Sequence, residues 1–290
     1  MKWQGRETSS NVDDRRGGGG GRKLGRAGAG VGVVGVIIAV VFALMNGQDP
    51  SGALRNMDLS PQPQATNTPS KTSAAEDEMA EFVSVVLKDC EDVWGKLFKE
   101  EFNEGYREPK MVLYTGGDES GCGSADARMG PFYCPADESV FIDLSFFSEL
   151  KSKFSAPGDF AVAYVVAHEV GHHVQNLLGT SAEMHAQRQR VSEAESNQLS
   201  VRLELQADFY AGVWAHHAQK MKNILDPGDV DEALGAAAAV GDDRLQKKSR
   251  GYVVEESFTH GTSEQRQRWF RKGFDTGDIN QGDTFGARKL

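Results

Sequence analysis

The chain has 290 residues, of which 39% are hydrophobic and 26% are charged, a composition typical of a folded protein with one large domain or two small ones. Its formal net charge is −10, yet residues 1–26 alone carry a net charge of +4, so the remainder carries −14. A body this acidic repels phosphate backbones, which excludes nucleic acid as an expected partner.

The first 46 residues predict a tail followed by a membrane anchor. Residues 1–26 are polar and basic, include five glycines in a row, and are predicted to form a disordered tail. The following run, AGAGVGVVGVIIAVVFALM, holds no charge, and we predict a transmembrane helix over 27–46. Because basic residues precede this helix, we expect a single-pass protein of the cell membrane with a cytoplasmic tail and an extracytoplasmic body. A cleaved signal peptide is the alternative, although the basic leader is long for one.

A linker is predicted next, and then one domain. Residues 47–75 are rich in Pro, Ser and Thr and should form a flexible linker, whereas hydrophobic patterning over 76–290 indicates a single domain. Disulfides form outside the cytoplasm. Cys122 and Cys134 are close in sequence and each lies near Gly or Pro, so we predict that they pair and leave Cys90 unpaired. Three free thiols are the alternative.

The periodicity of this domain predicts mostly helices. They are expected over 75–102, over 158–179 with Gly179 as the stop, twice between 181 and 222, over 229–246, and over 262–274 with Thr262 in the N-terminal signal. Strands are expected over 110–115 and 139–147, with a loop over 116–137. The predicted fold class is therefore α+β, mainly helical, with a small sheet before the 158–179 helix.

That helix contains the sequence HEVGH, which indicates a metal site. Residues four apart share one face of a helix, so His168 and His172 can bind one ion while Glu169 reaches a water on that ion. This is the H-E-x-x-H pattern of zinc hydrolases. His173 points about 100° away from His172 around the helix axis, so we expect it to be a packing neighbour. Gly171 costs a helix about 1 kcal/mol relative to alanine, which predicts a close neighbour at that position.

A catalytic zinc site needs three protein ligands and one open position. A third histidine at the G-x-x-H spacing is absent, because His185 lies off that spacing. The segment SVRLELQADFYAGVWAHH instead offers two carboxylates, Glu204 and Asp208, four residues apart on one helix face. Glu204 can complete a His2Glu site, and Asp208 can accept a hydrogen bond from a ligand histidine and fix its tautomer.

Five segments together carry a family resemblance. GCGSADARMGPFYCPADESVFIDLSFF, GDFAVAYVVAHEVGHHVQNLLG, LSVRLELQADFYAGVWAHH, GDDRLQ and SFTHGTSEQRQRWFRKGFDTGD resemble the bacterial putative neutral zinc metallopeptidase family, over about residues 76–286. The resemblance implies a zincin-type fold, one catalytic zinc ion and peptide hydrolysis. It implies His168, His172 and Glu204 as ligands, and Glu169 as the catalytic acid and base. Phe209 and Gly282 stand where the family usually has cysteines, which puts only a distal disulfide in doubt.

The predicted activity is zinc-assisted hydrolysis of peptide bonds in extracytoplasmic polypeptides, with peptide or protein substrates and the membrane as partners. Glu169 would move a proton from water to the leaving amine. His260, with Tyr252 behind it, is predicted to stabilise the oxyanion. The strand over 140–147 is predicted to align extended substrate as a sheet edge. The oligomeric state stays unknown.

The alternative function is a catalytically silent, zinc-stabilised binding or regulatory protein of the cell envelope. The presence of Glu169 favours hydrolysis, because a scaffold needs metal ligands but no general base. Hydrolysis of a non-peptide bond also stays open.

Overall fold

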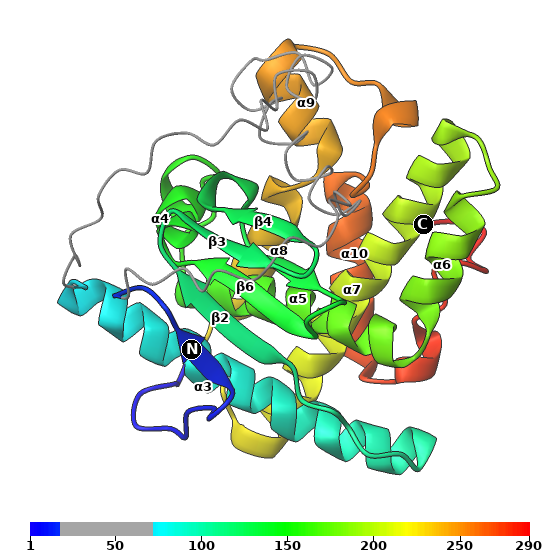
Figure 1. The fold of residues 1–290 in the computed structure, drawn as a ribbon. Coiled ribbons are helices and arrows are strands. Elements are labelled where there is room, and N and C mark those ends of the chain that lie inside the picture. The colour runs from blue at the N-terminus through cyan, green and yellow to red at the C-terminus, as the bar shows by residue number, and fades with distance from the viewer. Residues whose placement is uncertain (18–71) are drawn as a thin grey trace.

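The computed structural model describes residues 1–17 and 72–290 and combines helices with a small sheet, as predicted (Figure 1). The helices are α3 (Ala74–Leu97), α4 (Ser145–Ser152), α5 (Asp159–Leu177), α6 (Thr180–Arg188), α7 (Glu193–Lys222), α8 (Asp229–Ala239), α9 (Asp242–Arg250) and α10 (Ser263–Thr276). A π-helical turn, Phe98–Phe102, extends α3. The strands are β1 (Val12–Asp14), β2 (Lys110–Tyr114), β3 (Gly117–Ser120), β4 (Gly123–Asp126), β5 (Phe132–Cys134) and β6 (Ser139–Asp143).

The main sheet has the strand order β1-β2-β6-β5. β1 and β6 run parallel to β2, and β5 runs antiparallel to β6, while β3 and β4 form a separate hairpin. The predicted loop over 116–137 therefore contains three strands. The strand predicted over 139–147 is wrong beyond Asp143, because the carboxylate of Asp143 accepts the backbone N–H of Ser145 at 2.9 Å as α4 begins.

Helix α5 lies at the centre of the helical part and packs against α3, α7, α8, β5 and β6. It is buried on nearly every face, which explains why its sequence is apolar almost all round. It ends where predicted, since Gly179 takes a left-handed conformation with φ of 80°. The second helix after it, α7, begins at a capping box formed by Ser192 and Glu195.

Helices α7 and α10 approach each other backbone to backbone. A Cβ atom added at Gly212 of α7 would lie 2.1 Å from the carbonyl oxygen of Phe270, and one added at Gly273 of α10 would lie 2.1 Å from that of Phe209. The two glycines therefore permit a contact that no other residue type allows. The helix predicted over 229–246 is broken at Gly241, whose backbone is extended, with φ of −68° and ψ of 138°. A Cβ at Gly241 would lie 2.5 Å from the backbone nitrogen of Ser263.

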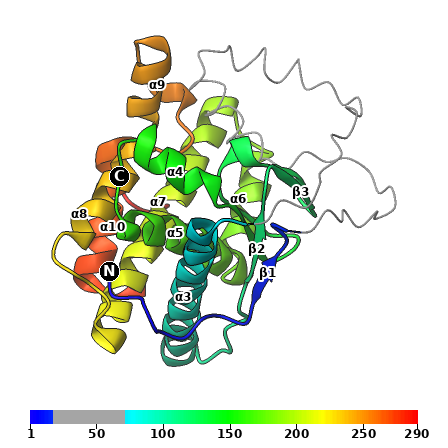
Figure 2. The same ribbon diagram turned by 90° about the vertical axis from the view of Figure 1, so that its left-hand side faces the viewer.

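Residues 1–17 pack against the body formed by residues 72–290 (Figures 1 and 2). Trp3 is 8% exposed, and its ring meets the ring of Phe82 on α3 edge to face, with centroids 5.3 Å apart. β1 continues the sheet beside β2. The prediction of a disordered tail is therefore wrong for residues 1–17, whose apolar side chains and strand pairing offset the ordering entropy.

Charged contacts hold the same segment in place. The backbone amino group of Met1 lies 2.6 Å from the carboxylate of Asp159, the first residue of α5, and 3.5 Å from that of Asp229 on α8. The guanidinium of Arg6 pairs with the buried carboxylate of Asp89, which also receives the ammonium of Lys222 at 2.8 Å. The segment thus bridges α3, α5 and α8.

The predicted transmembrane helix over 27–46 lies outside the described residues, as do most of the predicted linker and the end of the predicted tail. Among the helices of residues 1–17 and 72–290, none has the length and apolar character that crossing a membrane requires.

We predict that Gly212→Ala lowers the free energy of unfolding by about 1–3 kcal/mol, because the added methyl group meets helix backbone that cannot move aside. Gly235→Ala is the matched control, since Gly235 lies in α8 with no atom within 4 Å of an added Cβ. That change should leave stability unchanged or raise it by up to about 1 kcal/mol. Equal effects of the two substitutions in chemical denaturation of the full chain would contradict the close contact between α7 and α10.

Candidate metal centre

Helix α5 presents two histidines side by side at the edge of the core. His168 is 6% exposed and His172 is half-buried, and the centroids of their rings lie 4.8 Å apart. Four residues separate them along the helix, so both rings project from one face, as the sequence predicted.

Glu204 of α7 faces both rings. Its Oε2 atom lies 3.2 Å from Nε2 of His168, and its Oε1 atom lies 3.5 Å from Nε2 of His172. Two ligand atoms that bind one zinc ion tetrahedrally at 2.0–2.1 Å are themselves about 3.3 Å apart. The three side chains therefore have the chemistry and the spacing of a His2Glu zinc site.

The approach of α7 to α5 depends on Gly171. A Cβ atom at this position would lie 3.0 Å from the carbonyl oxygen of Ala207 on α7, closer than side chains normally come. The close neighbour predicted from the sequence is thus the backbone of the helix that carries Glu204. Glu204 and Ala207 lie within one turn of each other, so this contact sets the distance between the histidines and the carboxylate.

A hydrogen bond orients each histidine ring from its far side. Nδ1 of His168 lies 2.9 Å from Oδ1 of Asp208, and Nδ1 of His172 lies 2.8 Å from Oε1 of Gln175. Both partners accept, so each ring donates from Nδ1 and turns Nε2 toward Glu204, where a bound metal ion would take the place of a proton. The hydrogen bond predicted between Asp208 and a histidine of the motif is present.

Asp208 belongs to a larger buried network. It is fully buried and accepts hydrogen bonds from the hydroxyl of Tyr164 and from the guanidinium of Arg266 as well as from His168. These donors come from α5 and α10, so one carboxylate on α7 joins three helices. Such a buried charge persists only when it is paired and hydrogen-bonded.

The carboxylates set the protonation of the site. Burial alone would lower the pKa of His168, but Asp208 and Glu204 raise it to about 9. Burial alone would raise the pKa of Glu204, but the neighbouring His172 and His168 hold it well below its ordinary value. A proton and a metal ion therefore compete for the same Nε2 lone pair.

Glu169 has the properties of a general base. It follows His168 in α5, is 8% exposed, and has a pKa raised above its ordinary value by burial and by the charge of Glu204. The neighbouring histidines and a hydrogen bond from the backbone amide of Tyr133 act in the opposite direction. A carboxylate with a raised pKa is suited to accept a proton and release it again near neutral pH.

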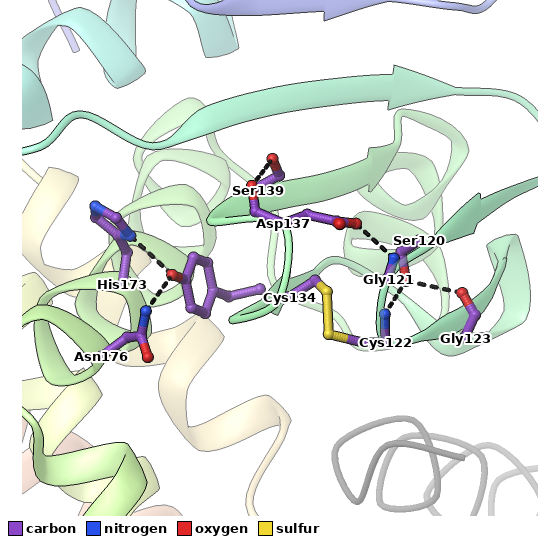
Figure 3. The surroundings of a disulfide bond; sticks show 10 residues. Ser120, Gly121, Cys122, Gly123, Cys134, Asp137, Ser139, His173 and Asn176 are labelled. Atoms are coloured by element: carbon purple, nitrogen blue, oxygen red, sulfur yellow. Dashed lines mark hydrogen bonds between the residues drawn. A yellow bond between two sulfur atoms is a disulfide. The ribbon is translucent and has the colours of Figure 1, made fainter. Parts of the chain in front are cut away.

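His173 is a packing neighbour, as predicted, and its partners lie on the sheet side of α5. Its Nε2 donates to the carbonyl oxygen of Arg107 at 2.6 Å, so its Nδ1 accepts from the hydroxyl of Tyr133 at 2.8 Å. The amide of Asn176 donates to the same hydroxyl at 3.1 Å. Figure 3 shows His173 and Asn176 on the same side of Cys134, the last residue of β5 and one half of the disulfide.

The predicted disulfide between Cys122 and Cys134 is present, and Cys90 is buried and unpaired within the described residues (Figure 3). The disulfide links the β3–β4 hairpin to β5, the strand that carries Tyr133.

Strand β5 is the edge of the main sheet nearest α5, whereas β6 pairs with a strand on each side. The predicted edge role for the strand over 140–147 is therefore wrong, and β5 occupies the edge.

His260 lies close enough to the site for the charge of Glu204 to act on it. Burial would lower the pKa of His260, but a hydrogen bond to Asp242 and the two carboxylates raise it above its ordinary value. Its Nδ1 lies 3.3 Å from Oδ1 of Asp242, and Oδ2 of the same carboxylate accepts its backbone N–H at 2.6 Å. Tyr252, predicted to stand behind it, is 61% exposed and lies beside Arg250.

Three residues of the site escaped the sequence analysis: Tyr164, Gln175 and Arg266. Tyr164 precedes His168 by four positions and Gln175 follows His172 by three, so helical spacing alone could have placed them beside the ligands. Arg266 lies ninety-four residues beyond His172 in an amphipathic helix, and nothing in its local sequence indicates burial.

Comparisons with known proteins agree with this geometry. The model of one protein family, described as "Putative neutral zinc metallopeptidase", matches residues 1–285. The chain is 50% identical over 290 residues to "Uncharacterized protein YpfJ" of Escherichia coli strain K12, with 99% of each chain covered. It is 42% identical over 263 residues to "Uncharacterized protein Rv2575" of Mycobacterium tuberculosis strain H37Rv, with 86% of each chain covered. No solved structure matches.

Proposed function

This chain belongs to the putative neutral zinc metallopeptidase family, and from that premise we propose that it is a membrane-associated zinc metallopeptidase that hydrolyses peptide bonds in extracytoplasmic polypeptides. The observation that carries the proposal is the position of Glu204, 3.2 and 3.5 Å from the Nε2 atoms of His168 and His172. We propose one catalytic zinc ion held by these three side chains within a zincin-type fold.

The donor set fits zinc. Two neutral imidazoles and one carboxylate are the ligands of a common class of zinc hydrolase, and a fourth position stays available to water. When bound, the ion supplies a Lewis acid that polarises a carbonyl and lowers the pKa of a bound water molecule to about 7. The chain's own side chains must then orient the ligands, move the proton and stabilise developing charge.

Glu169 moves the proton in this proposal. Its carboxylate follows His168 directly in α5 and is buried beside the ligands, where its raised pKa suits a group that takes up a proton and gives it back. Glu169 accepts the proton of the attacking water and delivers it to the nitrogen of the departing amine. This role distinguishes an enzyme from a zinc-stabilised scaffold.

His260 is the proposed donor to the oxyanion. The interaction with Asp242 orients its ring and favours the protonated form, and the raised pKa leaves a proton to donate as negative charge develops on the substrate oxygen. The effect of Glu204 on its pKa supports a place beside the site rather than a purely structural role.

Two features support attachment of the body to the outer face of a membrane. The uncharged run at 27–45 is apolar enough to associate with a membrane, and the disulfide Cys122–Cys134 favours an oxidising compartment. Residues 1–17 pack on the body, however, whereas a single crossing would place them on the opposite face. We therefore propose that residues 1–17 and 72–290 share one side of the membrane, in place of the cytoplasmic tail that the sequence predicted.

We predict that Glu169→Gln abolishes peptide cleavage and leaves zinc binding intact. Loss of the general base should reduce the rate by at least about 100-fold. The full chain and its variant would be incubated with an unstructured protein, with products identified by mass spectrometry and bound zinc measured in parallel. Glu183→Gln, on the exposed surface of α6, is the matched control.

Each outcome separates the candidate functions. Cleavage by the wild type and the Glu183 variant but not by the Glu169 variant supports the proposal. Undiminished cleavage by the Glu169 variant contradicts it. Zinc binding without cleavage by the wild type favours the alternative, a zinc-stabilised binding or regulatory protein.

The shared side of the membrane is tested by labelling intact cells with a membrane-impermeant maleimide. Thr8→Cys and Glu183→Cys each place one new thiol at an exposed position, in residues 1–17 and in α6 respectively. We expect both to be labelled without permeabilisation, with the wild type as the baseline for the native cysteines. If only one of the two variants is labelled before permeabilisation, residues 1–17 and α6 lie on opposite sides of the membrane, and the proposal is contradicted.

A further inference from the structure

Arg266 is a buried charged residue that points at the metal site from a third helix. It lies one turn into α10, which begins at a capping box on Thr262, and it is 3% exposed. Its Nε donates to Oδ2 of Asp208 at 2.8 Å, and its Nη2 donates to Oδ1 of the same carboxylate at 2.9 Å. The pairing is therefore bidentate, which fixes the plane of the carboxylate as well as its position.

The carboxylate held in this way is the one that orients His168. Oδ1 of Asp208 faces Nδ1 of His168 at 2.9 Å, while Oδ2 is taken by Arg266. Without the guanidinium fork, Asp208 could rotate about its terminal bond, and the hydroxyl of Tyr164 contacts only Oδ1. The two bonds from Arg266 resist that rotation.

Stability alone does not account for this arrangement. A buried ion pair contributes little net stability, since the cost of desolvating both charges offsets their attraction. The contact between α7 and α10 is already made by Gly212 and Gly273, whose backbones touch the opposite helix. Arg266 thus adds to a contact that already joins the two helices, and it also determines how Asp208 faces the ligand.

We propose that Arg266 is a positioning residue for the zinc ligand His168, acting through Asp208. It locks the carboxylate so that Nδ1 of His168 stays protonated and held, and Nε2 stays directed toward the space beside Glu204. The inference rests on the proposed function in one respect, because it requires His168 to be a metal ligand. It adds a residue from α10 to a site that the sequence builds from α5 and α7.

The test compares Arg266→Lys with Arg271→Lys in the full chain. Lysine keeps the positive charge but lacks the fork that grips both oxygens. Arg271 lies on the same helix with an exposed side chain, so its variant controls for the substitution itself. The readouts are the zinc dissociation constant, measured by competition with a chromophoric chelator, and the thermal midpoint of the metal-free protein.

We expect Arg266→Lys to weaken zinc binding by about 10- to 100-fold, as loss of an orienting partner does in other zinc sites. Arg271→Lys should bind as the wild type does. A folded Arg266→Lys protein with wild-type zinc affinity overturns the proposal, even if its thermal midpoint is lower. Absence of zinc binding by the wild type overturns the proposed function instead.

Folding failure is also decisive. If Arg266→Lys does not fold, zinc binding is measured with Arg266→Gln instead. The neutral amide removes the buried charge, and its single nitrogen cannot replace the two nitrogens with which Arg266 grips both oxygens of Asp208. A folded glutamine variant must show the same loss of zinc affinity. If neither variant folds, Arg266 is a residue of the fold, and the positioning role is overturned.

Discussion

The contact between α5 and α7 at Gly171 is the constraint on which the rest of the site depends. A Cβ at that position would lie 3.0 Å from the carbonyl oxygen of Ala207, so any other residue would push the two helices apart by a few tenths of an ångström. One helix then brings two imidazoles and the other brings a carboxylate to within 3.2 and 3.5 Å of them. Because each helix is rigid and buried, a shift of one against the other would change both distances together.

Around this contact the protein places several charges in a region from which water is largely excluded. Each is compensated: Asp208 by the guanidinium of Arg266, Glu204 by the two histidines, and His260 by Asp242. Glu169 differs, since burial and the charge of Glu204 raise its pKa and leave it ready to exchange a proton. Pairs of groups whose surroundings push their pKa values apart are typical of acid and base catalysis. The electrostatics and the ligand geometry therefore support the same chemistry.

How much the sequence could predict depends on how local each feature is. Helical spacing predicted that His168 and His172 share one helix face and that Glu204 and Asp208 share another, because residues four apart share a face whatever the tertiary structure. Features set by contacts far along the chain were missed. Nothing near Arg266 or Trp3 in the sequence signals burial. Gly241 packs against Ser263 at the start of α10, and β6 lies between β2 and β5. Periodicity describes one element at a time, whereas these features depend on pairs of elements.

The most direct test of the account is the position of zinc in crystals of the zinc-loaded full chain, located by anomalous diffraction at the zinc absorption edge. We expect one ion per chain, about 2.0–2.2 Å from Nε2 of His168, Nε2 of His172 and a carboxylate oxygen of Glu204, with water in the fourth position. An ion bound elsewhere, or a fourth protein side chain in the place of that water, would contradict a catalytic centre built from these two helices.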